Sequence, residues 1–181
     1  MSSLEEKAQP ILIRILDGSL PIEALTREQQ HILARWVGET AVVESHAVPA
    51  DHPVPATLLG WMRAHEEDAP GRFGVAVAKT ELNIVGHLQV GMIHDLIGGG
   101  ISAGNIVVLA LPNIALACAF PVPELTRGYD LRCDLAVYKP LWPSAASWTQ
   151  MQDLPPSIAP APARAVIIDL ASRIEIFHTM V

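Results

Sequence analysis

The chain has 181 residues, of which 50% are apolar and 17% are charged, and its 12 basic and 19 acidic side chains give a formal charge of −7. A charged fraction below the roughly 25% of average soluble domains excludes general disorder and predicts a substantial core. The acidic balance disfavours a surface built for phosphate backbones, because those surfaces rest on clustered Lys and Arg.

Two capping boxes predict the first two helices. Ser2 with Glu5, and Thr26 with Gln29, have the spacing at which each side chain reaches the other residue's backbone N–H. Apolar residues follow both boxes at helical spacing: Leu4, Ala8, Ile11, Leu12, Ile15 and Leu16 after the first, and Ile32, Leu33, Trp36, Val37 and Ala41 after the second. Two amphipathic helices are therefore expected.

Prolines and glycines mark the limits of these helices. Pro10 predicts a kink or a restart inside the first helix, because it removes a backbone donor, and Gly18 predicts its end. A third, shorter helix is expected over 58–65, before the turn signal at Pro70 and Gly71.

From Phe73 onward the apolar period changes to that of strands. Strands are expected at 73–77, 84–96, 106–111 and 131–138, with turns at 80–83 and 98–104. The whole apolar stretch 106–120 is interpreted as buried strand, since it is shorter than the roughly 20 residues that span a bilayer. Short connections make neighbouring strands antiparallel.

The last forty residues change in composition. Several prolines and an Ala/Ser-rich segment predict an extended surface connector over 141–163. The remaining apolar residues suit a helix over 164–181 better than a strand: Ile167, Leu170, Ile174, Phe177 and Val181.

These patterns predict the α+β class, with N-terminal helices packed on an antiparallel sheet. The expected single domain covers 1–140, with its helices in 1–69 and its sheet in 72–139. The Pro-rich connector follows, and the C-terminal helix packs back on the domain. Glu5 and Glu6 precede the first apolar positions, unlike the basic start of a signal peptide, so we expect a cytoplasmic protein without a membrane segment.

About the first 45 residues resemble part of a known family. The segments that carry the resemblance are Met1-Ser2-Ser3-Leu4-Glu5, Pro10-Ile11-Leu12, Leu25-Thr26-Arg27-Glu28-Gln29-Gln30-His31-Ile32-Leu33-Ala34-Arg35-Trp36 and Thr40-Ala41-Val42-Val43-Glu44. They are similar to the region just downstream of the nuclease motif in HNH endonuclease-like proteins of phages and bacteria. Leu141-Trp142-Pro143 is similar to a terminal segment of that family.

The sequence departs from the family where the chemistry would lie. The family's paired cysteines, catalytic histidine and asparagine are absent, so no catalytic residue carries over. The resemblance implies the accessory, noncatalytic half of such a protein. Cys118 and Cys133 are the only cysteines, too few for a zinc site or a disulfide framework, and no cofactor is expected.

The histidines and acidic residues form weak candidate metal or acid/base sites. His87, His94 and Asp95 lie in one expected strand, which would place His94 on the opposite face from the other two. The alternative is that each side chain satisfies a neighbouring backbone group. Ser102, Ser144 and Ser147 lie in no nucleophile motif.

Candidate partner-binding residues lie in three segments. Trp142 and Trp148 stand in the expected connector, where tryptophan serves either as an interface anchor or as a structural residue. A second group comprises the acidic residues Glu66, Glu67 and Asp68, whose alternative role is a hydrated helix end. The third is the glycine-rich turn 98–104, including Gly99 and Gly100, which is expected to be a flexible hairpin connection and whose flexibility makes it a candidate contact site.

Two functional hypotheses follow, and a third is retained. The first is a nonenzymatic protein-binding protein of phage or mobile-element type, which blocks a host nucleic-acid-handling complex such as a CRISPR effector. The second is a nucleic-acid-binding accessory domain of a truncated HNH endonuclease. The third is a metal-dependent enzyme using His87, His94 or Asp95. We expect a protein partner, such as a nuclease complex or a second copy of the chain, and weak binding of duplex DNA.

Overall fold

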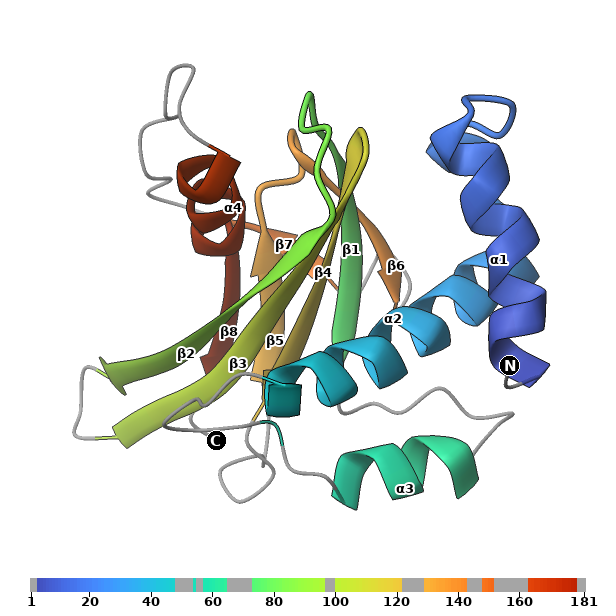
Figure 1. Ribbon diagram of the computed structural model, residues 1–181. Helices are drawn as coiled ribbons and strands as arrows, with labels where there is room; N and C mark the ends of the chain where they lie inside the picture. Colours follow the sequence, from blue (N-terminus) through green and yellow to red (C-terminus); the bar gives the residue numbers. More distant parts are fainter. Residues whose placement is uncertain are drawn as a thin grey trace.

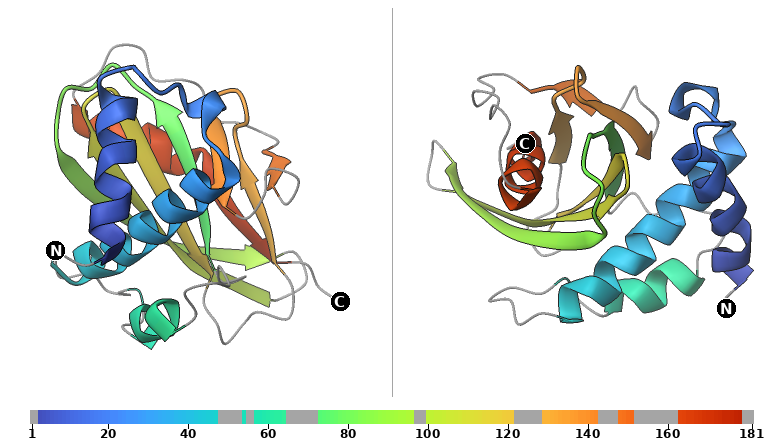
Figure 2. Two further views of the ribbon diagram at one scale, coloured as in Figure 1. Left: turned by 90° about the vertical axis from the view of Figure 1, so that its right-hand side faces the viewer. Right: turned by 45° about the horizontal axis from the view of Figure 1, so that its top comes forward.

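The computed structural model describes residues 3–47, 54, 57–64, 73–96, 100–121, 129–142, 148–151 and 163–178. The N-terminal helices lie outside a curved antiparallel sheet, and the C-terminal helix lies inside its curve (Figures 1 and 2). The predicted α+β class is therefore confirmed. No helix among the described residues is long and apolar enough to cross a membrane.

The helical elements follow the local sequence signals closely. They are α1 (Ser3–Leu16), the short 3-10 helix η1 (Ile22–Ala24), α2 (Arg27–Ala47) and α3 (Thr57–Ala64). The second capping box forms as predicted, because the Gln29 N–H donates to Thr26 Oγ1 at 3.2 Å and the Thr26 N–H donates to Gln29 Oε1 at 3.0 Å. The first helix passes through Pro10 without restarting, and Gly18 follows it with φ of +78°.

Five strands form the main sheet in the order β2-β3-β4-β1-β6, and every neighbouring pair is antiparallel. They are β1 (Gly74–Lys79), β2 (Gly86–Leu96), β3 (Gly100–Leu111), β4 (Ile114–Pro121) and β6 (Tyr138–Trp142). A smaller sheet in the order β7-β5-β8 contains β5 (Tyr129–Cys133), β7 (Trp148–Gln150) and β8 (Ile174–His178). In this smaller sheet, β5 and β7 run parallel.

Two expected single strands are each divided by a tight turn. The stretch 106–120 belongs to the hairpin of β3 and β4, which turns at Pro112 and Asn113. Asn113 has φ of 66°, the left-handed conformation that asparagine tolerates and that short hairpin turns need. The stretch 131–138 belongs to β5 and β6, and Asp134 organises the turn between them by accepting the backbone N–H of Ala136 and of Tyr138.

Three further expectations are corrected. The predicted 98–104 turn is strand from Gly100 onward, because β3 pairs with β2 from Gly100 to Ala110. The expected connector begins within β6 and includes β7, while 143–147 and 152–162 lie outside the described residues. The C-terminal helix α4 (Ala163–Ser172) ends early, and β8 follows it because Ile174 and Ile176 alternate toward the core instead of continuing a helical stripe.

The main sheet separates two hydrophobic cores. Val75 and Val77 of β1 face the core beneath the N-terminal helices, whereas Ala76 and Ala78 face the core shared with α4 and the smaller sheet. The alanine face lets the second layer approach closely. A Cβ added at Gly74 would lie 2.6 Å from the Trp148 ring, so the absence of a side chain there makes room for the tryptophan.

Candidate binding groove

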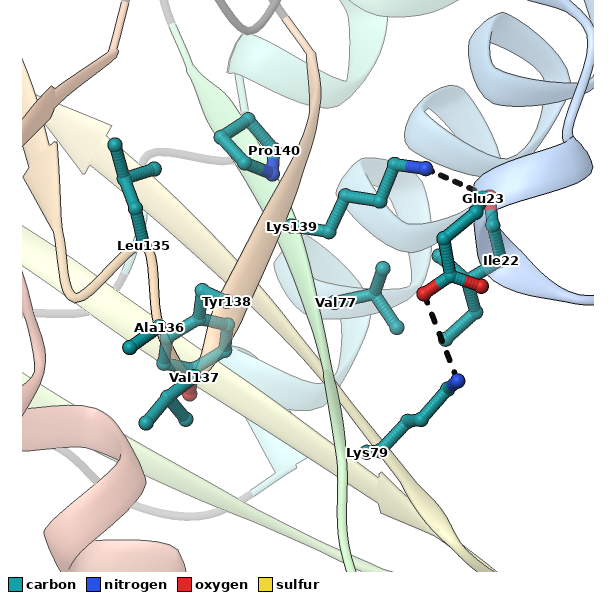
Figure 3. Close-up of a pocket in the computed structure, with 10 residues that line it drawn as sticks. All are labelled: Ile22, Glu23, Val77, Lys79, Leu135, Ala136, Val137, Tyr138, Lys139 and Pro140. Atoms are coloured by element: carbon teal, nitrogen blue, oxygen red, sulfur yellow. Dashed lines mark hydrogen bonds and ion pairs between the residues drawn. The ribbon is translucent and has the colours of Figure 1, made fainter.

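An open groove of about 610 Å³ lies between η1 and the end of the main sheet (Figure 3). Its floor and walls are mainly apolar and come from η1, β1, β6 and the turn before β6: Ile22, Val77, Leu135, Ala136, Val137 and Pro140. Glu23, Lys79 and Lys139 supply the charges. Apolar concave surfaces with a few converging polar groups are the usual form of a binding site.

The pairing of β1 with β6 brings the two lysines together. Val77 lies opposite Lys139 in the antiparallel register, and Lys79 follows two positions later in β1. Because alternate residues of a strand share a face, Lys79 lies on the same face of the sheet as Val77 and Lys139. Ile22 is buried beside them and anchors η1 against this face.

The charges of the groove are only partly balanced. Lys79 Nζ lies 3.5 Å from Glu23 Oε1, with both side chains about two-thirds exposed, and Lys139 Nζ donates to the Ile22 carbonyl oxygen at 3.2 Å. A hydrogen bond with its own backbone lowers the pKa of Glu23, burial opposes this, and both lysines lower the pKa further. Two ammonium groups therefore face one carboxylate, which leaves a local excess of one positive charge among these three side chains.

Several arginines of the described residues are engaged in ion pairs elsewhere. Arg35 and Arg63 both approach Glu39, at 3.6 Å each, and Arg173 pairs with Asp134 and Asp169 at 2.8 and 3.0 Å. Such pairs leave less positive charge for a phosphate backbone.

The two tryptophans predicted as partner anchors lie in different surroundings. Trp148 is only 4% exposed in the core beneath α4, and its indole N–H donates to the Trp142 carbonyl oxygen at 3.2 Å. Of the two roles that the sequence left open for Trp148, the structure favours the structural one, because the side chain fills the space above Gly74. Trp142 belongs to β6, is half-buried and stacks on His31 with ring centroids 5.3 Å apart.

The weak metal candidates all lie on β2, and the structure describes the side chain of His87 among them. His87 Nδ1 lies 3.0 Å from Glu44 Oε2 at the end of α2, and His94 and Asp95 occupy consecutive positions of β2. Among the described residues, no three His, Cys, Asp or Glu side chains lie close enough to hold a metal ion.

Most of the other predicted partner-binding residues cannot be placed relative to the groove. Glu66, Glu67, Asp68 and Gly99 lie outside the described residues. Gly100 is the first residue of β3, opposite Leu96, and belongs to the paired part of the hairpin.

Sequence reasoning missed the groove because its lysines are distant in the chain and join only through strand pairing. One signal was present: Lys79 continues the alternation of Val75 and Val77, which places it on a core-facing side at the end of a strand. Comparison with family models, with curated proteins and with solved structures finds no match. The groove must therefore be interpreted from its own chemistry.

Proposed function

We propose that this protein is a binding domain whose groove holds an acidic, partly apolar segment of a partner protein. The observation that carries the proposal is the placement of Lys79 and Lys139 above the apolar floor of the groove. An aliphatic or aromatic side chain fits that floor, and a neighbouring Asp or Glu matches the excess positive charge.

The shape of the groove favours a protein segment over duplex DNA. A peptide can place alternating apolar and acidic side chains into one pocket, whereas duplex binding needs many cationic groups spread along a face. Here the two lysines adjoin Glu23, and Arg35, Arg63 and Arg173 are held in ion pairs.

The test uses a display library of random peptides of about 12 residues, selected against the full chain. We expect the enriched peptides to carry Asp or Glu beside a large apolar residue. Fluorescence polarisation should show that Lys79→Met and Lys139→Met each weaken their binding by about tenfold, and that added salt weakens binding to the wild-type chain.

Lys7→Met provides the matched control, because Lys7 is exposed on α1, outside the groove, and loses the same charge. Enrichment without acidic residues, or equal affinity of the wild-type and groove variants, would refute the proposal. Submicromolar, steeply salt-dependent binding to random duplex DNA would instead favour the nucleic-acid-binding hypothesis.

A further inference from the structure

The two edges of the main sheet are built differently. β6 has five residues, including Lys139 and Pro140, and its pairing with β1 contains a register shift. Short length, a lysine, a proline and an irregular register are devices that prevent another strand from adding to an edge. This edge is protected.

The opposite edge, β2, lacks these devices. The strand runs for 11 residues, Gly-His-Leu-Gln-Val-Gly-Met-Ile-His-Asp-Leu, without Pro, Lys or Arg. It pairs with β3 in an unbroken register, and none of the other described strands pairs with its outer side. A long regular edge of this kind is a template for another strand.

The sequence of β2 is complementary to itself in one antiparallel register. When a two-fold axis perpendicular to the sheet relates the two copies, each face of one sheet continues into the same face of the other. Residues directly opposite each other must then be both odd-numbered or both even-numbered. The register centred on Gly91 overlaps all 11 residues and places His87 of each copy opposite Asp95 of the other. Registers centred on Val90 or Met92 shorten the overlap and lose both His87–Asp95 pairs.

We propose that β2 is a dimerisation edge, at which a second copy of this chain pairs antiparallel around Gly91 and joins two five-stranded sheets into one. The two His87–Asp95 pairs fix the register, since a ring N–H of histidine directly opposite a carboxylate can donate a hydrogen bond to it. Glycine at the centre allows the two backbones to approach closely where the copies meet. The surface is distinct from the groove, so this inference does not rest on the proposed function.

The two proposed His87–Asp95 pairs can be tested by substitution and rescue. We expect the wild-type chain to sediment at twice the monomer mass at about 100 µM, a concentration at which even weak interfaces associate. His87→Glu should weaken the dimer by about tenfold, because it places two carboxylates opposite one another, and Asp95→Lys should do the same, because it removes the hydrogen-bond acceptor opposite His87. The double variant should restore the dimer, because it places a carboxylate opposite an ammonium group at both positions.

The rescue separates the interface from a local effect. His87→Glu also places a carboxylate beside Glu44, and that contact persists in the double variant. Restored association can therefore only come from the pair across the interface. A monomeric wild-type chain, a dimer insensitive to both single substitutions, or a double variant that stays monomeric would overturn the proposal.

A cross-linking experiment tests the register independently. Two copies of Gly91→Cys would have Cα atoms about 4.5–5.5 Å apart, within the range of a disulfide bond. Mild oxidation should therefore yield a covalent dimer. The native Cys118 and Cys133 are buried, which keeps them out of the reaction.

Val85→Cys is the matched control, since this residue is 78% exposed just before β2. In the proposed register its two copies lie about 40 Å apart and cannot be bridged. Equal cross-linking of both variants, or none at residue 91 in a folded protein, would overturn the register.

Discussion

At the scale of single residues, Arg173 is the residue with the clearest role in stabilising the fold. Its guanidinium is buried between α4 and the turn after β5, where it donates to Asp134 Oδ2 at 2.8 Å and to both carboxylate oxygens of Asp169. The hydrogen bond with Asp169 raises the pKa of Arg173, so the group stays charged despite its burial. The same turn is organised by Asp134, so one cluster fixes the loop and the helix end together.

Arg173→Met should lower the free energy of unfolding by about 3–5 kcal/mol, because the buried Asp134 loses its cation. The control is Arg63→Met, whose side chain is 64% exposed and lies 3.6 Å from Glu39. It should cost no more than about 1 kcal/mol. Urea denaturation at neutral pH measures both, and equal costs would contradict the assigned role of Arg173.

At the scale of elements, the close packing of α2 depends on a glycine. A Cβ added at Gly38 would lie 2.4 Å from Met62 Cε of α3 and 2.9 Å from the Phe73 ring. Glycine lowers the helical propensity of α2 at this position, but its lack of a side chain allows the helix to pack closely against α3 and Phe73.

Gly38→Ala should therefore destabilise the protein by about 1–2 kcal/mol, since the cost of overpacking exceeds the gain of about 1 kcal/mol in helical propensity. Gly60→Ala in α3 is the matched control, because a Cβ there meets nothing within 4 Å. It should stabilise the protein by about 0.5–1 kcal/mol. Thermal unfolding should shift in opposite directions for the two variants, and two shifts of the same sign would argue against this packing.

The elements also show how far the sequence could predict this fold. Helix starts were predictable because a capping box, such as that of Thr26 and Gln29, depends on only four consecutive residues. Strand limits were not, because the turn at Pro112 and Asn113 is only two residues long and leaves the apolar run almost continuous. The groove was not predictable either, because Lys79 and Lys139 come together only through the pairing of β1 with β6, which no local sequence pattern predicts.

At the scale of the whole molecule, Trp148 links the two sheets. It lies in β7 of the smaller sheet, fills the space over Gly74 of the main sheet, and bonds to the Trp142 carbonyl in β6. Trp148 is thus one of the large side chains of the second core, together with Leu131, Ile174 and Ile176, that hold the smaller sheet to the main sheet.

Trp148→Ala should lower the free energy of unfolding by about 3–5 kcal/mol, because it opens a cavity between the sheets. Thr149→Ala, at the adjacent exposed position, should leave stability within about 0.5 kcal/mol of the wild type. Denaturant unfolding followed by near-ultraviolet circular dichroism measures both. An unchanged unfolding midpoint for Trp148→Ala would contradict its role in linking the two sheets.

The strand order has a consequence for synthesis of the chain. β1 lies between β4 and β6, both of which leave the ribosome after it. Until they emerge, β1 has neither of its hydrogen-bonding neighbours, and its Val75 and Val77 can be covered only by the helices already made. The N-terminal helices therefore shield an incomplete sheet during translation, and a chain interrupted before β6 leaves β1 as an unprotected edge prone to aggregation.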